Sequence, residues 1–119
     1  MRIGVGTDIE GIDRFRNLHH GRHRRFLERI FTPRELKYCF SKKDPAPHLA
    51  ARFCAKEAVV KALASVGIHK VARREIEVAN TSKGVPKIIL RTKAKPLQIQ
   101  VSLSHTLDYA IAFVIAELL

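Results

Sequence analysis

The longest apolar stretch of the chain reads HLAARFCAKEAVVKALASVG and covers residues 48–67. An advance of about 100° per residue places one apolar set on a single helical face: Leu49, Phe53, Val60, Leu63 and Ala64. Alanines and Cys54 occupy most of the other positions, so the expected helix is apolar over much of its circumference. Gly67 is a suitable C-terminal stop. The stretch therefore predicts a central, heavily packed helix from His48 to Val66.

A second helix is predicted before this stretch. Thr32-Pro33-Arg34-Glu35 combines a Thr N-cap, a Pro at the first helical position and a Glu three residues after the cap. We expect this helix to continue to about Phe40, before Asp44-Pro45-Ala46-Pro47 breaks the chain. A short helix at residues 11–18 and a basic stretch from His19 to Arg25 are expected upstream.

The N-terminus is predicted to form a half-buried strand over residues 2–9. Its side chains alternate, with Ile3, Val5, Thr7 and Ile9 on one face and Gly4, Gly6 and Asp8 on the other. Because the glycine face is nearly bare near Asp8, another group can approach the backbone closely there.

Four more strands are expected after the long helix. Glu75–Asn80 and Val85–Leu90 flank Thr81-Ser82-Lys83-Gly84, which predicts a hairpin. Gln98–His105 alternates strictly, and Tyr109–Ala116 is apolar on both faces, as a central strand is. The order of one strand, helices and then four strands indicates an α+β fold in a single domain, residues 1–119.

The charge of the chain indicates a polyanionic partner. Its 119 residues contain 22 Lys and Arg against 11 Asp and Glu, a net charge of +11. Nucleic acid, a phosphorylated cofactor or an acidic protein would each suit this charge. Residues 96–119 contain no Lys or Arg. The basic surface must therefore come from the first 95 residues.

Several classes of protein are excluded by composition. No apolar run approaches the ~20 residues that span a bilayer, and the start of the chain lacks the apolar stretch of a signal peptide. Cys39 and Cys54 have no CxxC spacing, which argues against a disulfide framework and a zinc knuckle. We expect a cytoplasmic protein with no membrane contact.

Two carboxylates are candidates for a metal site. Glu57 falls inside the apolar sector of the long helix, where a carboxylate needs a partner or a cation. An i,i+4 pair with Lys61 is the structural alternative. Asp8 ends a strand on its glycine face, where capping of the next helix is the alternative. Two such carboxylates, completed by substrate oxygens, would make a Mg²⁺ site.

Basic residues on the same helix are candidates for phosphate binding. Arg52 and Lys56 lie one turn apart on what we expect to be its more exposed edge, and Lys61 follows. A solvated face is the structural alternative. His105 ends an alternating strand among hydroxyl side chains, where it could contact phosphate or ribose or serve only as a structural hydrogen-bonding group.

Four motifs, in the same order, resemble those of the holo-acyl-carrier-protein synthases, a family of 4′-phosphopantetheinyl transferases. They are GVGTDIE at residues 4–10, FTPREL at 31–36, RFCAKEAVVKA at 52–62 and SLSHTLDYA at 102–110. Cys54 departs from the pattern, which usually has Ala there. The ordered set covers nearly the whole chain, which makes the match specific although each motif alone would be weak.

The resemblance implies a fold, an assembly and a reaction. The fold is an antiparallel sheet packed against a long central helix, and the assembly is a homotrimer with active sites at subunit boundaries. A helix apolar on too many sides for one small domain agrees with that assembly. The reaction transfers 4′-phosphopantetheine from coenzyme A to a serine of apo-acyl carrier protein in fatty acid biosynthesis, with Mg²⁺ as cofactor and adenosine 3′,5′-bisphosphate as the second product.

The resemblance also implies roles for individual residues. Asp8 and Glu57 would bind the metal, and Lys61 would contact the pyrophosphate, so that these three form the catalytic set. The serine would attack the β-phosphorus, with a metal-bound water, or Glu57 through water, as the base.

Further residues would bind the rest of the substrates. Arg52, Lys56 and His105 are candidates for the remaining phosphates and the ribose of coenzyme A. Arg14, with neighbours such as Arg22 and Arg25, would meet the acidic surface of acyl carrier protein.

Two other functions remain possible from the residues alone. A small basic nucleic-acid-binding domain, such as a ribosome-associated protein, would account for the charge but not for Glu57 on an apolar face. It predicts RNA binding that weakens steeply with salt. A basic interaction module with purely structural carboxylates predicts that Asp8→Ala and Glu57→Ala affect stability alone.

Overall fold

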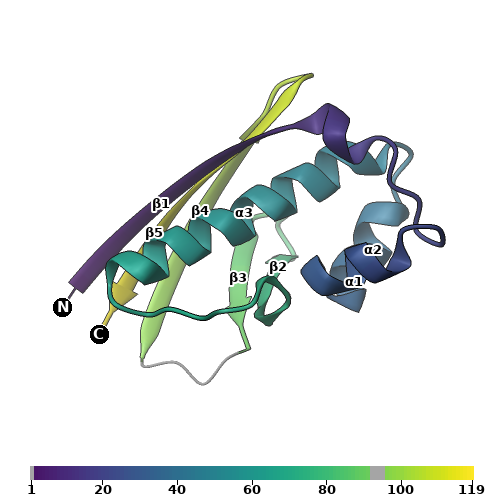
Figure 1. Cartoon of the computed structure of the whole chain (residues 1–119). Helices are drawn as coiled ribbons and strands as arrows, with labels where there is room; N and C mark the ends of the chain where they lie inside the picture. The colour runs from purple at the N-terminus through teal and green to yellow at the C-terminus, as the bar shows by residue number, and fades with distance from the viewer. Residues whose placement is uncertain (1, 92–95) are drawn as a thin grey trace.

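A three-stranded antiparallel sheet carries one long helix along its inner face (Figure 1). The computed structural model describes residues 2–91 and 96–119. The strands of this sheet lie in the order β1-β5-β4, and β2 pairs with β3 in a separate hairpin. The elements are β1 (Arg2–Gly11), the 3₁₀ helix η1 (Ile12–Phe15), α1 (Arg24–Ile30), α2 (Pro33–Phe40), α3 (Pro45–Ser65), the 3₁₀ helix η2 (Arg73–Glu75), β2 (Ile76–Asn80), β3 (Pro86–Leu90), β4 (Leu97–His105) and β5 (Tyr109–Leu118).

The long helix α3 begins three residues earlier than predicted. The Asp44 side chain accepts a hydrogen bond from the backbone N–H of Ala46 at 3.4 Å, and proline is tolerated in the first helical turn. The Pro-rich segment therefore starts the helix rather than preceding it. At the other end Gly67 has φ +86°, and Ile68 N–H donates to the Leu63 carbonyl at 2.9 Å. This is a Schellman C-cap, as the glycine predicted.

The two glycines of β1 allow α3 to lie directly on the sheet. A Cβ at Gly4 would approach the Ala62 carbonyl oxygen to 2.2 Å, and one at Gly6 would approach the Ala58 carbonyl oxygen to 2.0 Å. Both distances are shorter than any van der Waals contact. The close backbone approach predicted for this face is confirmed, and the approaching group is α3 of the same chain.

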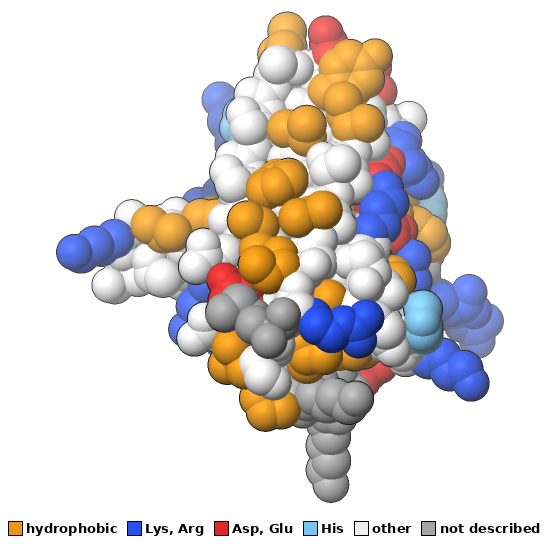
Figure 2. All heavy atoms as spheres, turned by 90° about the vertical axis from the view of Figure 1, so that its left-hand side faces the viewer, with side chains coloured by type: hydrophobic (Ala, Val, Ile, Leu, Met, Phe, Trp, Pro, Cys, Tyr) orange, Lys and Arg blue, Asp and Glu red, His pale blue; other side chains and the backbone are white. Residues whose placement is uncertain are grey.

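The opposite face of the sheet is uncovered and apolar. Ile3, Val5 and Ile9 of β1 are 61%, 56% and 60% exposed, and Ile111 and Phe113 of β5 lie beside them. Figure 2 views this side of the molecule and shows hydrophobic side chains gathered along it. Burial on one face only was predicted for β1, and the buried face is the one with the glycines.

The second side of α3 is covered by the other helices and the hairpin. The helix from Pro33 and the hairpin are confirmed, with Thr32 and Glu35 forming a capping box and Gly84 at φ +79° in the turn. The helix predicted at residues 11–18 is only the 3₁₀ turn η1. Helix α1 was not predicted, because it buries a single apolar side chain, Leu27, and has no clear apolar face.

The central strand was identified correctly. Tyr109–Leu118 lies between β1 and β4, and Ala110, Ala112, Val114 and Ala116 face α3. Cys39 and Cys54 are both buried free thiols. Across the described ranges, no helix has both the length and the apolar character that a bilayer span requires.

Candidate active site

Asp8 lies on the inner face of β1 and is held by Lys61. Its carboxylate Oδ1 is 3.3 Å from the Lys61 ammonium, which also donates to the Thr7 carbonyl at 2.9 Å. The second oxygen, Oδ2, is buried and has no hydrogen-bond partner. A buried carboxylate oxygen without a donor is costly, and it is the kind of atom that accepts a cation.

Glu10 lies two residues further along the same strand, on the same face. Burial, and then the neighbouring Asp8 carboxylate, raise the pKa of Glu10, although Arg14 lowers it through an ion pair. The Arg14 guanidinium also lies 5.4 Å from the centre of the Phe53 ring. Asp8, Glu10 and Arg14 therefore form one charged cluster at the end of β1.

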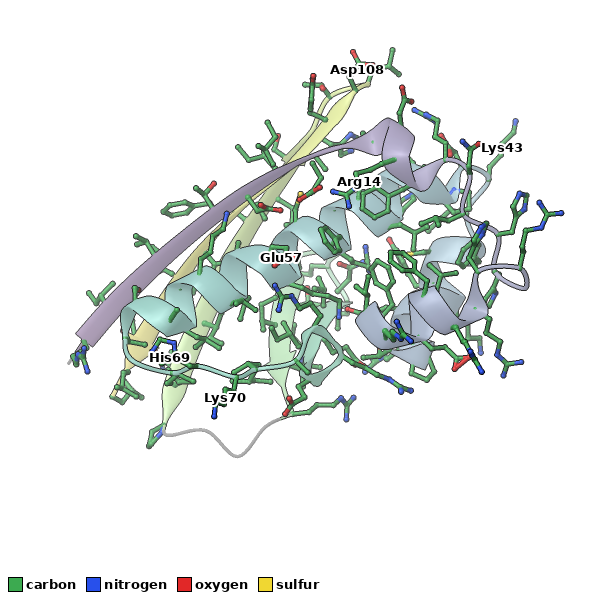
Figure 3. The ribbon with its side chains drawn as sticks, in the orientation of Figure 1. Arg14, Lys43, Glu57, His69, Lys70 and Asp108 are labelled. Carbon is green, nitrogen blue, oxygen red and sulfur yellow. The ribbon has the colours of Figure 1, made fainter. Side chains whose placement is uncertain are left out.

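Glu57 lies on α3, one turn before Lys61, but its ion-pair partner is Arg73. Its Oε2 accepts a hydrogen bond from the guanidinium of Arg73 at 2.7 Å, whereas Lys61 is paired with Asp8. The i,i+4 pair with Lys61, the structural alternative considered for Glu57, is therefore not formed. Figure 3 shows Glu57 midway along α3, with Arg14 on its β1 side.

These contacts join the two candidate metal ligands through one helix. Lys61 lies one turn after Glu57 on α3 and reaches across to Asp8 on β1. Both carboxylates are half-buried, with 14% and 21% of their side-chain surfaces exposed, and each is balanced by a basic side chain. The result is a small set of carboxylate oxygens on two rigid elements, which suits a hard divalent cation.

The chain alone does not complete a metal site. Within residues 2–91 and 96–119, no group of three or more His, Cys, Asp and Glu side chains is arranged to hold a metal ion. A cation held by Asp8 and Glu57 would take its other ligands from water or from substrate oxygens, as Mg²⁺ commonly does.

Lys56 is not on an exposed edge, so that prediction is wrong. Its side chain is fully buried, and its ammonium is 2.7 Å from Oε1 of Glu35 and 3.0 Å from the Arg73 carbonyl. It also donates to the Ile76 carbonyl. Burial lowers the pKa of Lys56, and the Glu35 carboxylate opposes that effect. Lys56 joins α3 to α2 and β2 and offers no free donor to a phosphate.

Arg52 was also expected on the exposed edge, and it too is buried, with 5% of its surface exposed. Its guanidinium carbon lies 4.1 Å from the centre of the Tyr38 ring, and its Nε has no hydrogen-bond partner. With Arg34 and Asn80, Arg52 lines a cavity of about 290 Å³ between α2, α3 and β2. A guanidinium that lines a cavity can bind an anion.

His105 lies apart from the carboxylates, at the exposed end of β4. With Lys42, Lys43 and His48 it lines a cavity of about 360 Å³ at the N-terminus of α3. In the described part of the chain, no hydrogen bond or ion pair links His105 or Arg52 to Asp8 or Glu57. The structure therefore brings Asp8 and Lys61 into contact and pairs Glu57, one turn before Lys61 on α3, with Arg73. It places Arg52 and His105 in two separate basic cavities.

Two site residues were missed from the sequence. Glu10 could have been found, because the period of two in a strand places it beside Asp8. Arg73 gave no signal, since it lies in a short 3₁₀ turn and contacts a residue 16 positions earlier in the chain.

Comparison with known proteins points to one family. The family model of the 4′-phosphopantetheinyl transferase superfamily matches residues 4–114. The holo-[acyl-carrier-protein] synthase of Chlamydia muridarum is 46% identical over 97% of this chain and 94% of its own length. That of Caldanaerobacter subterraneus subsp. tengcongensis is 42% identical over 98% and 95%.

A solved structure agrees with these sequence matches. The holo-[acyl-carrier-protein] synthase of Helicobacter pylori, in complex with coenzyme A, superposes with a TM-score of 0.78 and 31% identity, over 95% of this chain and 99% of that one. These similarities support the α+β fold that was expected and give no support to a nucleic-acid-binding domain.

Proposed function

The chain belongs to the 4′-phosphopantetheinyl transferase superfamily, and we propose that it transfers 4′-phosphopantetheine from coenzyme A to a serine of apo-acyl carrier protein. The serine Oγ attacks the β-phosphorus of the coenzyme A diphosphate, and the bond from that phosphorus to the bridging oxygen breaks. Adenosine 3′,5′-bisphosphate leaves with the bridging oxygen, and the serine gives up its proton. The products are holo-acyl carrier protein and adenosine 3′,5′-bisphosphate.

The observation that carries this proposal is the ion pair of Asp8 on β1 with Lys61 on α3, one turn after Glu57. The unpartnered Oδ2 of Asp8 and the all-oxygen donor set suit Mg²⁺. Asp8 and Glu57 would hold the ion, which when bound supplies positive charge to the diphosphate oxygens. A metal-bound water, or Glu57 through a water, would accept the serine proton.

Lys61 would bind the diphosphate. Its side chain is 57% exposed, so its ammonium can leave Asp8 for a phosphate oxygen without a change in the backbone. Arg52 and His105 would bind the other phosphates and the ribose, because each lines a basic cavity. We assign Lys56 to the fold instead, since its ammonium is fully paired.

Arg14, Arg22 and Arg25 would contact the carrier protein. All three are exposed, on η1, α1 and the segment between them, and Arg14 lies next to the Asp8 end of β1, where it pairs with Glu10. Exposed arginines attract an acidic partner and increase its association rate more than its final affinity.

We also propose that the protein is a homotrimer with active sites at its subunit boundaries. We expected α3 to have apolar surface left for a second subunit, but the sheet, η1, α2 and β2 of the same chain cover this helix. The uncovered surface is the outer face of the sheet, with Ile3, Val5, Ile9, Ile111 and Phe113 exposed side by side. A patch of this kind marks an interaction surface.

The test is direct. The protein is mixed with apo-acyl carrier protein, coenzyme A and Mg²⁺, and mass spectrometry is used to look for carrier that has gained phosphopantetheine. We expect complete conversion with the native protein and, in the same time, at most about one hundredth of that rate with Glu57→Gln. Glu28→Gln, which removes an exposed carboxylate on α1, is the matched control and should convert normally. Absence of product with a competent carrier would refute the proposal.

A further inference from the structure

Arg73 enters the candidate site from a different part of the chain than the other charged residues. Its guanidinium is 2.7 Å from Oε2 of Glu57 and its side chain is 40% exposed. Its backbone carbonyl accepts a hydrogen bond of 3.0 Å from the buried ammonium of Lys56, the residue before Glu57. Arg73 is therefore anchored by its backbone while its guanidinium remains at the surface, against Glu57.

The contact conflicts with the role of Glu57 as a metal ligand. An oxygen that accepts a short charge-assisted hydrogen bond cannot give the same lone pair to a cation. A guanidinium remains protonated at any working pH, so deprotonation does not remove the competition. While Arg73 holds Oε2, Glu57 can offer a metal ion only its other oxygen, Oε1, on a carboxylate whose charge is already balanced.

We propose that Arg73 is a positioning residue that competes with the divalent cation for Glu57. Without substrate it holds the Glu57 carboxylate and weakens metal binding. When coenzyme A brings diphosphate oxygens to the site, Arg73 exchanges the carboxylate for this second anion. Metal and coenzyme A then bind cooperatively, because each helps to separate Arg73 from Glu57. This inference rests on the proposed function.

The balance of charges at the site supports the exchange of Glu57 for diphosphate as the partner of Arg73. Asp8 and Glu57 already have two basic partners, Lys61 and Arg73, so a divalent cation would add two positive charges to a balanced group. The diphosphate supplies the negative charge that lets both basic side chains remain nearby. The exposure of Arg73 leaves its guanidinium free to turn toward that anion.

Mn²⁺ binding provides the test, with no turnover needed. Its dissociation constant is measured by calorimetry or electron paramagnetic resonance on native protein, Arg73→Ala, Arg73→Lys and the matched control Arg74→Ala. Arg74 neighbours Arg73, is exposed and has no ion pair within the described residues. We expect Arg73→Ala to bind Mn²⁺ alone about three- to ten-fold more tightly, since one partly exposed ion pair is removed. Arg73→Lys should lie between, and Arg74→Ala should match the native protein.

A second measurement repeats the titration with coenzyme A present. The tightening of Mn²⁺ binding by coenzyme A should be large in the native protein and smaller in Arg73→Ala. Equal or weaker Mn²⁺ binding by Arg73→Ala, or no measurable binding by either protein, overturns the inference. If the native protein converts the carrier normally and the Mn²⁺ titrations still give one of these results, only the role proposed for Arg73 is rejected. Failure to convert the carrier rejects the proposed function itself.

Discussion

Two clusters of charged side chains contact α3, and they differ in how completely their members are paired. The inner cluster joins Lys56 to Glu35, whose carboxylate also accepts from the backbone N–H groups of Thr32 at 2.8 Å and Val78 at 2.7 Å. The site cluster joins Asp8 to Lys61 and Glu57 to Arg73, and leaves one Asp8 oxygen without a partner.

The difference separates a structural role from a chemical one. Lys56 and Glu57 are neighbours in sequence, yet Lys56 is fully buried with every donor used, whereas Glu57 is 21% exposed and paired with the more exposed Arg73. A fully paired buried ion is costly to disturb and has little to offer a substrate. Partly exposed carboxylates, one of which has an oxygen without a partner, can accept a new cation.

The largest expected effect is on stability, from Lys56→Met. This change leaves the Glu35 carboxylate buried without its cation, and we expect the free energy of unfolding to fall by about 3–5 kcal/mol. Urea denaturation measures it. Lys61→Met is the matched control, because Lys61 is exposed, and should cost less than about 1 kcal/mol. Equal losses in the two variants would show that the clusters do not differ as described.

The second prediction concerns the cysteine beneath each cluster. Burial raises the pKa of Cys39 and of Cys54 to about 12, with Glu35 contributing at Cys39 and Asp8 at Cys54. A raised thiol pKa keeps the neutral form at pH 8. We therefore expect native-state alkylation to be about a thousandfold slower than for a free thiol.

Mass spectrometry after iodoacetamide treatment, with urea-unfolded protein as the control, checks both cysteines. If either cysteine of the native protein were labelled as fast as in urea, that thiol would not be buried as described. Lys56→Met should increase labelling of Cys39, because that variant opens more often.

Glu57→Gln should have a smaller but still clear effect, and on transfer alone. Loss of one carboxylate ligand is expected to lower the transfer rate by about 100-fold or more, since several kcal/mol of charge stabilisation are involved. The free energy of unfolding should change by less than about 1 kcal/mol. Turnover of carrier protein and thermal unfolding, measured on one preparation, test both halves. Near-normal turnover would remove Glu57 from the site.

The smallest expected effect is on stability, from the exposed arginines that contact Glu77. Glu77 is buried but is contacted by two exposed arginines, Arg91 at 3.1 Å and Arg34 at 3.5 Å. Because Arg91 remains, Arg34→Ala should lower the free energy of unfolding by about 0.5 kcal/mol or less. The double variant with Arg91→Ala should cost more than the sum of the two single changes. Simple additivity would mean that the arginines do not share Glu77.

Much of the fold follows from local signals in the sequence. The capping box at Thr32, the glycine stop at Gly67 and the two strands expected at Gln98–His105 and Tyr109–Ala116 each depend on neighbouring residues, and each is confirmed. Helix α1 was missed because it has only a weak apolar pattern. The start of α3 was placed too late because its prolines, Pro45 and Pro47, read as a break in the chain.

The site was only partly predictable because its contacts join distant segments. Periodicity placed Arg52 and Lys56 on an edge of α3, but the partners that bury them, Tyr38 and Glu35, belong to α2. The pair between Arg73 and Glu57 is of the same kind. Which face of the strand at residues 2–9 is buried was equally hidden, since alternation defines two faces without saying which one α3 covers.

Gly4 and Gly6 have a consequence for the mutational tolerance of the chain. Every other amino acid has a Cβ, and at these positions that atom would overlap backbone oxygens of α3, which cannot rotate away. In a saturation library, both codons should therefore accept glycine alone. The exposed neighbours Ile3 and Val5 should accept other β-branched residues. A period-two pattern of intolerance along the first strand would thus report how closely α3 lies on the sheet.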